Sequence, residues 1–402
     1  MLSLFLRKAP VAFFSTCSPM GSPKQRMKLT MPSNTAAWLV AYRSRLEIKP
    51  APYTHPSDDE IVVKNHAVAI NPLDWILQVA GSVAYRWIKL PFVLGTDVAG
   101  EVVEVGSAVT RFAVGDRVLG MAVGTDKDSN SPARGAFQTY TVVLERLAAP
   151  IPSTMPYENA VVLPLGLSTA ACALFQSDQL ALQHPSADPA PTGRTLIVWG
   201  GSTSVGSNAI QLAVAAGYDV VTTASPRNFD YVRKLGADQV FDYRSPTVVP
   251  DIVQALRGKT LAGALAIGQG SAGRCADILA SCSGNKFISL ASTPVSFDKL
   301  ATSRRGSFQL PRTLFKIVSL TLRLQITCRL RGIRTKFIFG STLKNNEVSK
   351  VIYQDFLPSA LQDGRFVAAP DPLVVGHGLE HVQAGMDTQL KGVSAQKVVV
   401  SL

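Results

Sequence analysis

A glycine-rich loop near the middle of the chain constrains the fold more than any other feature. It reads Gly200-Gly201-Ser202-Thr203-Ser204-Val205-Gly206 and separates a predicted buried strand, Arg194–Val198, from a predicted helix, Asn208–Ala216. Gly200 can make the tight turn off the strand, and Gly206 allows the helix to pack closely on the sheet. The N–H groups that open the helix can then face a pyrophosphate. The alternative is an ordinary Gly/Ser loop without a ligand.

The segments on either side of this loop indicate two kinds of domain. After about residue 155, strands alternate with helices, which is typical of a doubly wound parallel sheet. Before it, many short strands are separated by glycine turns, which indicates a smaller β-rich domain. In the parallel sheet we expect strands at Arg194–Val198, Asp219–Ala224, Gln239–Phe241, Ala262–Ile267 and Lys286–Leu290. The predicted fold class is α/β, with a β-rich domain attached.

The end of the second predicted strand bears on the choice of cofactor. Ser225-Pro226-Arg227-Asn228 stands about 20 residues beyond the loop, where a carboxylate would bind a ribose 2′-hydroxyl and select NAD. No acid is present there, and an arginine beside hydroxyl and amide donors suits a 2′-phosphate, so we predict NADPH. Tyr243, just after the third strand, could add a phenolic donor or simply pack. In the alternative interpretation Asn228 caps a helix and Arg227 is solvated.

Composition excludes several other classes of protein. Hydrophobic residues make up 47% of the 402 residues and charged residues 17%, which is typical of a compact globular protein. No apolar run reaches the roughly 18 residues that a membrane span needs. The net charge of +12 is concentrated in residues 1–30 and 301–344, which contain no acid, so we do not extend a nucleic-acid interpretation to the fold. The five scattered cysteines include no C-x-x-C pair, which fits a reducing compartment.

The first 30 residues are basic, lack acids and contain several serines. This composition resembles a mitochondrial presequence; the alternatives are a disordered tail or a start at Met20, Met27 or Met31. We expect a cytoplasmic protein, with a mitochondrial location as the alternative.

Three further motifs connect the chain to a known family. They read Ala69-Ile70-Asn71-Pro72-Leu73-Asp74-Trp75, Leu94-Gly95-Thr96-Asp97-Val98-Ala99-Gly100 and Leu165-Gly166-Leu167-Ser168-Thr169-Ala170-Ala171. With the glycine loop, residues 225–228 and the tail 392–397, they resemble the medium-chain dehydrogenase/reductase superfamily. More narrowly, they resemble the fungal zinc-independent, enoyl-reductase-like proteins within it. The resemblance covers most of residues 34–298 and 335–402.

The resemblance implies a GroES-like β domain that carries the substrate site, a Rossmann domain inserted near the middle of the chain, and a C-terminal return to the first domain. The active site should then lie in the cleft between the domains. The corresponding divisions are residues 1–33 for an N-terminal extension, 34–163 for the GroES-like domain, 164–341 for the Rossmann domain and 342–402 for the return.

The same resemblance bears on metal binding. Zinc-dependent relatives carry a cysteine at the position of Asn71 and a His-Glu pair at Thr96-Asp97, and the cysteine cluster of a structural zinc is also missing. Catalytic zinc needs about three protein ligands around an open position, whereas the five histidines here are dispersed. His66, on a predicted strand, fits a structural residue better than a ligand. We therefore predict no metal site.

The family pattern also implies which residues line the site. The nicotinamide end should include Leu73, Asp74, Trp75, Ile76, Thr169, Ala266, Ile267, Val393 and Ser394, and the substrate side Leu165, Gly166, Leu167 and Ser168. Some relatives carry a lysine where Ile76 stands, so no fixed proton donor is implied there. Tyr85 is the candidate donor, because tyrosines in this loop serve that role in some enoyl reductases; packing is the alternative.

Residues of about 300–334 depart from the family pattern and look like a basic insertion in the Rossmann domain. Leu314–Leu330 mixes apolar and cationic residues, which could form an amphipathic helix for a membrane surface. The alternative is a translated intron, which we favour because the family pattern resumes intact on both sides.

Without a metal, alcohol dehydrogenation lacks its Lewis acid, whereas reduction of an electron-poor double bond needs hydride, donors for an enolate and a proton. We expect an NADPH-dependent reductase of a conjugated C=C (enoyl or enone) or of a quinone, with a role in secondary metabolism. The alternative is a non-catalytic NADPH-binding partner of a biosynthetic complex. The expected partners are a small-molecule substrate and a polyketide synthase, without nucleic acid, for a monomer or homodimer.

Overall fold

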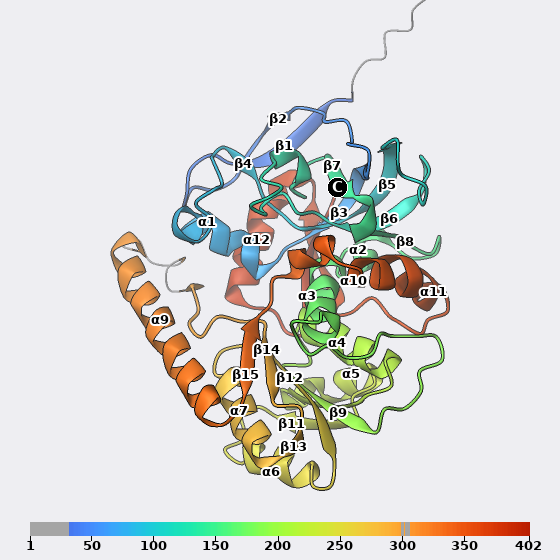
Figure 1. Ribbon diagram of the computed structural model, residues 1–402. Coiled ribbons are helices and arrows are strands. Elements are labelled where there is room, and N and C mark those ends of the chain that lie inside the picture. The colour runs from blue at the N-terminus through green and yellow to red at the C-terminus, as the bar shows by residue number, and fades with distance from the viewer. Residues whose placement is uncertain (1–31, 299–300, 302–305) are drawn as a thin grey trace, which may run out of the picture. The chain divides into compact units, whose positions relative to one another are not determined.

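The structure, a computed structural model, describes residues 32–298, 301 and 306–402. The expected N-terminal extension lies almost entirely outside these residues. The chain divides into Met1–Pro32 and a second unit, Ser33–Leu402, which contains every helix and strand described below. In the view of Figure 1, the β-rich part of this second unit lies above its parallel sheet.

The parallel sheet has the strand order of a dinucleotide-binding fold. Its continuous path is β11-β10-β9-β12-β14-β15, and every pair along it is parallel. Numbered in chain order, these strands run 3-2-1-4-5-6, as in a Rossmann sheet. The strands are β9 (Arg194–Trp199), β10 (Asp219–Ala224), β11 (Gln239–Asp242), β12 (Thr260–Ala266), β14 (Phe287–Leu290) and β15 (Arg334–Phe337). The five strands predicted from the sequence are confirmed to within two residues at each end.

Helices connect these strands across both faces of the sheet. They are α4 (Ser204–Ala215), α5 (Phe229–Lys234), α6 (Val248–Ala255), α7 (Ser271–Ser281) and α9 (Gly306–Leu330). The first of them begins four residues earlier than predicted, because Thr203 caps it: its side chain accepts a hydrogen bond from the N–H of Gly206. Gly217 follows the same helix with a φ of +77°, as expected for a glycine that ends a helix.

The order of the sheet reverses between β9 and β12, and this reversal positions the cofactor loop. At such a switch point the carboxyl ends of the two strands open a crevice. The glycine loop follows β9, and Ile267 follows β12. The Ile267 N–H donates to the Trp199 carbonyl at 3.1 Å, and a Cβ on Gly200, whose φ is +92°, would lie 3.1 Å from the Ile267 carbonyl. The two segments therefore meet at the mouth of the crevice.

The β-rich domain is built on a second sheet that both ends of the chain share. Its path is β16-β17-β3-β5-β6-β8, and β7 also pairs with β3. The strands are β3 (Glu60–Ala69), β5 (Asp97–Val105), β6 (Arg117–Met121), β7 (Tyr140–Leu144), β8 (Ala148–Pro150), β16 (Asp371–His377) and β17 (Gln396–Ser401). A smaller sheet of β2 (Glu47–Ala51), β1 (Asn34–Leu39) and β4 (Phe92–Val93) lies beside it in the same cluster of buried side chains. Together with the Rossmann sheet, this confirms the predicted fold class.

Two helices join the domains at the centre. These are α2 (Tyr157–Ala160) and α3 (Pro164–Phe175), and α3 packs against α4. By length and composition alone, the stretch Tyr157–Phe175 would be long and apolar enough to cross a membrane, but 78% of it is buried inside the fold. It acts here as a core helix, and its residues belong to the largest buried cluster.

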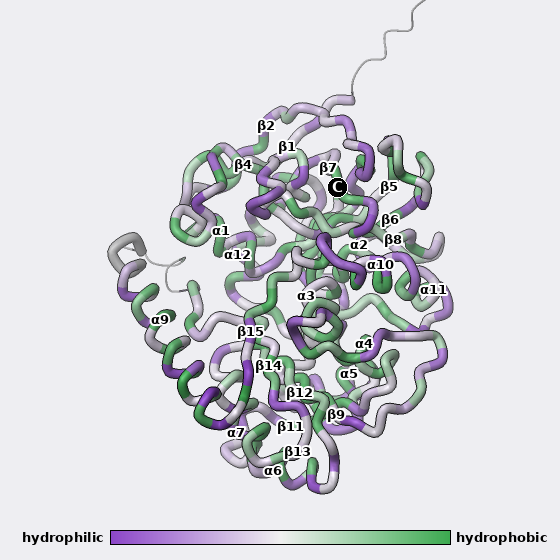
Figure 2. Tube along the Cα trace, in the orientation of Figure 1, coloured by the Kyte–Doolittle hydropathy of each residue, from purple (hydrophilic) through white to green (hydrophobic). Residues whose placement is uncertain are grey.

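The basic stretch 300–334 supplies the connection to the sixth strand of the Rossmann sheet. Two adjacent parallel strands need a crossover, and α9 lies between β14 and β15 in the chain. Cys328 and Ile333 are buried with the residues of α7 and β14, and Leu324 packs against the same cluster. The strand order and this packing favour a genuine structural element over a translated intron. Figure 2 shows apolar and hydrophilic residues interleaved along α9.

The central pairing of β3 with β5 yields a stability prediction. A Cβ on Gly100 would lie 2.0 Å from the Lys64 carbonyl, so Gly100→Ala forces the two strands apart and should destabilise the protein by about 1–3 kcal/mol. The matched control is Gly273→Ala in α7, where a Cβ meets nothing within 4 Å and the added helix propensity should stabilise the protein slightly. Urea unfolding of both variants tests this; equal effects of the two would contradict it.

Candidate active site

The cofactor loop is held rigidly against the neighbouring strand. The N–H of Gly200 donates to the Thr223 hydroxyl at 3.0 Å, and the N–H of Gly201 donates to the Thr223 carbonyl at 2.9 Å. Thr203 donates its hydroxyl to the Gly200 carbonyl at 2.8 Å while it caps α4. These hydrogen bonds hold the first turn of α4 at the carboxyl ends of the parallel strands, where the N-terminus of a helix favours binding of an anion.

Close approach explains the glycines of this loop. A Cβ on Gly206 would lie 2.2 Å from the Gly200 carbonyl, and a Cβ on Gly201 would lie 2.2 Å from the Thr222 hydroxyl. The Ser204 hydroxyl, in the first turn of α4, is buried without a hydrogen-bond partner among the described residues. An unsatisfied donor at a helix N-terminus beside a glycine cradle fits a phosphate group. The residues of the loop therefore fit the pyrophosphate of a dinucleotide.

The residues predicted to read the ribose lie together at the next strand ends. Ala224 pairs with Asp242, so Ser225 and Tyr243 follow adjacent strands at one edge. Arg227 is exposed, whereas Ser225 and Asn228 are buried. Tyr243 is 37% exposed, and its phenolic oxygen accepts a hydrogen bond from Arg244 at 3.2 Å. This edge of the sheet therefore carries two cations that could bind a 2′-phosphate, Arg227 and Arg244. Arg244 was not predicted from the sequence.

One contact joins two residues that were predicted to bind different parts of the cofactor. The Asn228 side-chain amide donates to the Ser394 hydroxyl at 3.0 Å. Asn228 was predicted beside the 2′-phosphate and Ser394 beside the nicotinamide, so the contact makes them neighbours. The part of the cofactor that this pair binds stays a prediction. Val393 packs against the core of the β-rich domain.

A buried polar network occupies the position where zinc-dependent relatives are expected to hold metal. Asn71 donates its amide to the Thr96 hydroxyl at 2.9 Å and to Asp97 Oδ2 at 2.8 Å. Lys397 Nζ lies 2.8 Å from Asp97 Oδ2 and donates to the side-chain amide oxygen Oδ1 of Asn71 at 2.5 Å. Asp97 Oδ1 accepts the N–H of Leu165, in the first turn of α3, at 2.7 Å. The Asp97 carboxylate thereby connects β5, β17, α3 and the start of α1 (Pro72–Ala84).

The charge of Asp97 is already balanced by this network. The Asp97 side chain is completely buried, and the Lys397 side chain is 5% exposed. Both carboxylate oxygens accept hydrogen bonds, so neither is available as a free metal ligand. Among the described residues, no group of three or more His, Cys, Asp and Glu side chains could hold a metal ion. His66 stacks on Tyr157 with ring centroids 4.6 Å apart, in keeping with a structural residue.

Asp74 adds a second buried carboxyl group at the start of α1 (Pro72–Ala84). Its Oδ2 accepts the N–H of Asn71 at 2.7 Å. Burial raises the pKa of Asp74 to about 7, and the nearby charge of Asp97 acts in the same direction. Asp74 therefore supports the turn that carries Asn71, and its side chain faces the interior. Of the predicted neighbours, Leu73 and Ile76 pack at the edge of the same core.

Helix α3 brings one of the predicted substrate residues, Gly166, to the first turn of α4. A Cβ on Gly166 would lie 2.4 Å from the Ser204 hydroxyl, so α3 and α4 touch at their first turns. Leu165 and Thr169, one turn apart, are the half-buried residues of this part of α3. A Cβ on Gly340, after β15, would lie 2.7 Å from the Thr169 hydroxyl.

The prediction that Leu167 and Ser168 line the substrate site is wrong. Both side chains are completely buried. Leu167 lies in the largest core, and the Ser168 hydroxyl lies 2.7 Å from the Tyr353 hydroxyl, which in turn donates to the Pro164 carbonyl. The family motif locates this helix in the chain, but its 100° rotation per residue turns these two positions inward. Tyr353, which fixes them, was missed from the sequence.

Tyr85 ends α1 and packs against Trp87, with ring centroids 5.0 Å apart. Burial raises the pKa of its phenol, and the charge of Asp126 contributes in the same direction. The phenol therefore keeps its proton at neutral pH, as a proton donor must. Among the described residues, no hydrogen bond joins Tyr85 to the cofactor loop, so its role stays a prediction.

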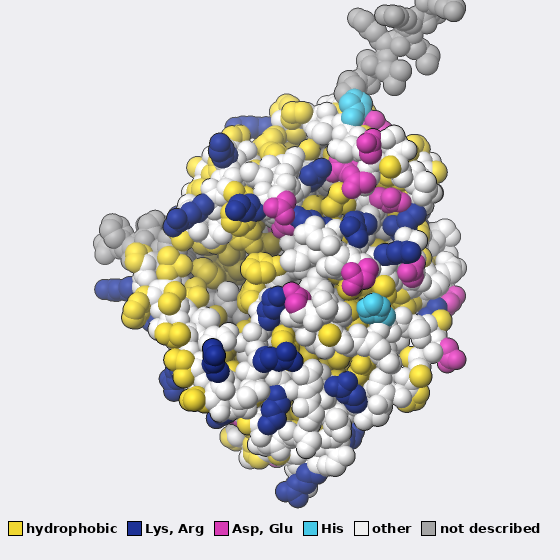
Figure 3. All heavy atoms as spheres, in the orientation of Figure 1, with side chains coloured by type: hydrophobic (Ala, Val, Ile, Leu, Met, Phe, Trp, Pro, Cys, Tyr) yellow, Lys and Arg dark blue, Asp and Glu magenta, His cyan; other side chains and the backbone are white. Residues whose placement is uncertain are grey.

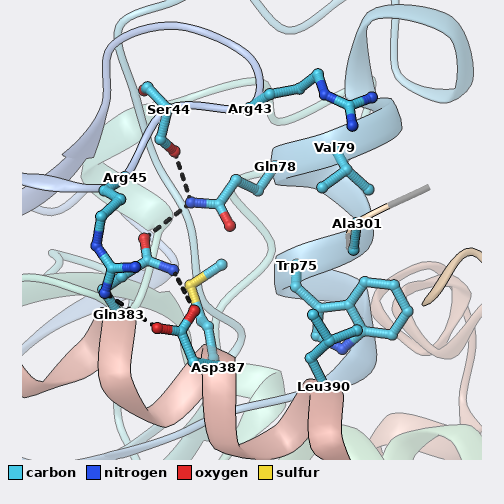
Figure 4. A pocket seen from close by; sticks show the side chains of 11 residues that line it. Arg43, Ser44, Arg45, Trp75, Gln78, Val79, Ala301, Gln383, Asp387 and Leu390 are labelled. Atoms are coloured by element: carbon cyan, nitrogen blue, oxygen red, sulfur yellow. Dashed lines mark hydrogen bonds and ion pairs between the residues drawn. The ribbon is translucent and has the colours of Figure 1, made fainter. Parts of the chain in front are cut away.

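A cavity of about 380 Å³ opens between α1 and α12 (Val382–Lys391), and Figure 4 shows the side chains that line it. Trp75 is the single predicted site residue in its lining. Its polar groups satisfy one another: Arg45 pairs with Asp387 at 3.0 Å, and Gln78 donates to Gln383 at 2.9 Å. We therefore assign the active site to the crevice at the glycine loop and not to this cavity.

Comparison with known protein families agrees with this organisation. Residues 57–153 match the alcohol dehydrogenase GroES-like domain, and residues 204–293 match the zinc-binding dehydrogenase domain. Among solved structures, an alcohol dehydrogenase superfamily protein from Novosphingobium aromaticivorans has a TM-score of 0.69 at 22% identity, over 92% of this chain and 99% of that one. Mycobacterial Rv1454c complexed with NADPH has a TM-score of 0.64 at 20% identity, over 92% and 100%. At these identities the likeness shows the fold.

Three fungal proteins are similar in sequence over most of the chain. The dehydrogenase pigH of Monascus ruber is 54% identical, over 92% of this chain and all of pigH. The trans-enoyl reductase himH of Aspergillus japonicus is 40% identical over 92% and 97%. The enoyl reductase component lovC of the lovastatin nonaketide synthase of Aspergillus terreus is 34% identical over 86% and 89%. The chain therefore belongs to the medium-chain dehydrogenase/reductase superfamily and, within it, to the fungal enoyl-reductase-like family of oxidoreductases.

Proposed function

We propose that this protein is a metal-independent reductase that uses NADPH to reduce a conjugated C=C bond or a quinone. The observation that carries the proposal is the Lys397–Asp97–Asn71 network at the position of the catalytic metal in zinc-dependent relatives. An ammonium ion that is buried against the carboxylate cannot polarise a substrate as an open metal site does. Reduction of an activated double bond does not need that Lewis acid.

The residues of the crevice fit NADPH in two places. The pyrophosphate would lie at the first turn of α4, where Ser204 lacks a partner among the described residues. The 2′-phosphate would lie beside Arg227 and Ser225, with Ser394 and Asn228 below it and Arg244 nearby. Bound NADPH supplies the hydride. The structural likeness to a protein complexed with NADPH supports the choice of a nicotinamide cofactor.

On the substrate side, the chain supplies orientation and hydrogen-bond donors. Leu165 and Thr169 share a half-buried face of α3 that lies against Gly340, and we take the Thr169 hydroxyl as the candidate donor to an enolate oxygen. Tyr85 keeps its phenolic proton at neutral pH and is the candidate acid for the α-carbon. The names of the relatives himH and lovC support an enoyl substrate, and that of lovC, a component of a nonaketide synthase, supports a polyketide synthase as partner. The cytoplasmic location stays a prediction.

Turnover of defined substrates tests the proposal. The purified full chain, dialysed against a chelator, should oxidise NADPH with at least one member of a panel of enones, quinones and enoyl thioesters. Added zinc should not raise the rate, because Asp97 is already paired with Lys397. Tight binding of NADPH without turnover would favour the second candidate, a non-catalytic NADPH-binding partner. Activity that a chelator abolishes and zinc restores would contradict metal independence.

Replacement of Arg227 tests the choice of cofactor. Loss of a charge-assisted bond to the 2′-phosphate in Arg227→Ala should raise the KM for NADPH about tenfold or more and leave that for NADH unchanged. Arg233→Ala is the matched control, because Arg233 is exposed on the following helix and pairs with Asp230. An equal rise with both cofactors would argue against a 2′-phosphate site.

Removal of the buried cation tests the network itself. Lys397→Met leaves the Asp97 carboxylate buried without its counter-ion, which should cost about 3–5 kcal/mol of unfolding free energy. The double variant Asp97→Asn/Lys397→Met removes both charges and should recover most of that loss. Chemical denaturation of the three proteins measures the difference; a single variant as stable as the unmodified chain would show that the ion pair does not anchor the site.

A further inference from the structure

Helix α9 exposes four large apolar side chains on the face that points away from the rest of the fold. Phe315, Val318, Leu322 and Ile326 are 74%, 65%, 59% and 52% exposed. They recur every three or four residues, so they form one stripe along the helix, which we call the outer stripe of α9. A single exposed apolar residue needs no explanation, but a continuous stripe over three turns marks an interaction surface.

The opposite side of α9 is already occupied. Ile317 packs against the buried cluster of the β-rich domain, whereas Leu324 and Cys328 pack against that of the Rossmann domain. The helix is thus anchored to both clusters by one face. The outer stripe is therefore a second apolar face that the fold does not use.

Cations line one edge of the outer stripe. Arg312, Lys316 and Arg323 are exposed and lie at spacings of four and seven residues, which places them along a common line. No acid occurs between residues 301 and 344. Figure 3 shows hydrophobic and Lys or Arg side chains together along the side of the molecule where α9 runs.

This chemistry discriminates between the surfaces that could cover the stripe. A second copy of α9 would bring the same cations against one another without an acid to balance them, which is unfavourable. A bilayer with anionic headgroups matches both parts of the surface. Apolar side chains of an interfacial helix enter the boundary between headgroups and acyl chains, while lysines and arginines beside them reach the lipid charges. A bilayer surface can accept the outer stripe of α9 without a complementary groove.

We propose that the outer stripe of α9 binds the surface of an anionic membrane and holds the protein there peripherally. The inference is independent of the proposed function, because none of these residues belongs to the cofactor crevice. Each cation at an anionic surface contributes about fivefold to the partition coefficient, and that contribution declines as salt screens it. Binding should therefore depend on anionic lipid, on low ionic strength and on the outer stripe.

Co-sedimentation of the full chain with lipid vesicles tests the proposal. The probes are vesicles of phosphatidylcholine alone and vesicles in which about a third of the lipid is phosphatidylserine. Phe315→Ser/Leu322→Ser removes the centre of the stripe and should weaken binding to the anionic vesicles about tenfold or more. Arg312→Gln/Lys316→Gln/Arg323→Gln should weaken it about a hundredfold, at about fivefold for each cation.

Matched controls replace exposed side chains of the same kinds, apolar or cationic, elsewhere on the surface. Val114→Ser removes a side chain that is 64% exposed, and Lys127→Gln/Arg257→Gln/Lys350→Gln removes three exposed cations outside α9. Both should bind anionic vesicles as the unmodified chain does. An unchanged midpoint of thermal unfolding in every variant shows that the fold is intact, as expected because the substituted side chains are exposed.

Three outcomes of the binding experiments, and one of transcript sequencing, would overturn the proposal. The first is equal binding to neutral and anionic vesicles, or an equal loss in the control and α9 variants. The second is absence of vesicle binding together with a dimer that the stripe variant dissociates, which would assign the stripe to a second copy. The third is absence of vesicle binding together with tight binding of an acidic amphipathic peptide, which would assign it to a protein partner. A spliced transcript without the codons for residues 300–334 would remove α9 altogether.

Discussion

The ion pair between Lys397 and Asp97 holds together the parts of the chain on which the candidate site depends. Asp97 belongs to β5, Lys397 to β17, Asn71 to the turn before α1, and Leu165 to the first turn of α3. Two charges removed from water in this way are stable only when their partners are in place. Each partner here comes from a different element, so the network requires the β-rich sheet, its C-terminal return and α3 to be assembled at once.

The proposed metal independence depends on the same network. An amide, a hydroxyl and a carboxylate stand in the positions expected for metal ligands, and a lysine neutralises the carboxylate. Under the proposed function, the remaining chemistry is hydride transfer to an activated acceptor, supported by hydrogen-bond donors. That chemistry suits reduction of a conjugated double bond, whereas dehydrogenation of an alcohol depends on a Lewis acid.

Local pattern predicted the strands of the Rossmann sheet well, but it did not predict which strands pair in the β-rich sheet. Strands such as Asp219–Ala224 are short apolar runs between helices and turns, so their bounds could be read from neighbouring residues. The pairing of β17 with β3 joins residues more than 300 positions apart, and the family resemblance, not periodicity, indicated it. Lys397 was missed as a functional residue for the same reason. Leu167 and Ser168 were misassigned because a motif gives position along a helix but not which way each side chain turns.

The long sequence separation between Asp97 and Lys397 has a consequence for folding during synthesis. Lys397 lies about 300 positions after Asp97, so at about 5–20 residues per second it is synthesised roughly 15 s or more after its partner. During that interval Asn71 and Asp97 are present without the cation that neutralises them. The Rossmann domain can form its own sheet during synthesis, since domains generally fold as units in order of their appearance. The Lys397–Asp97 network, in contrast, forms only once β17 has been made and pairs with β3, so its assembly comes after that of the Rossmann strands.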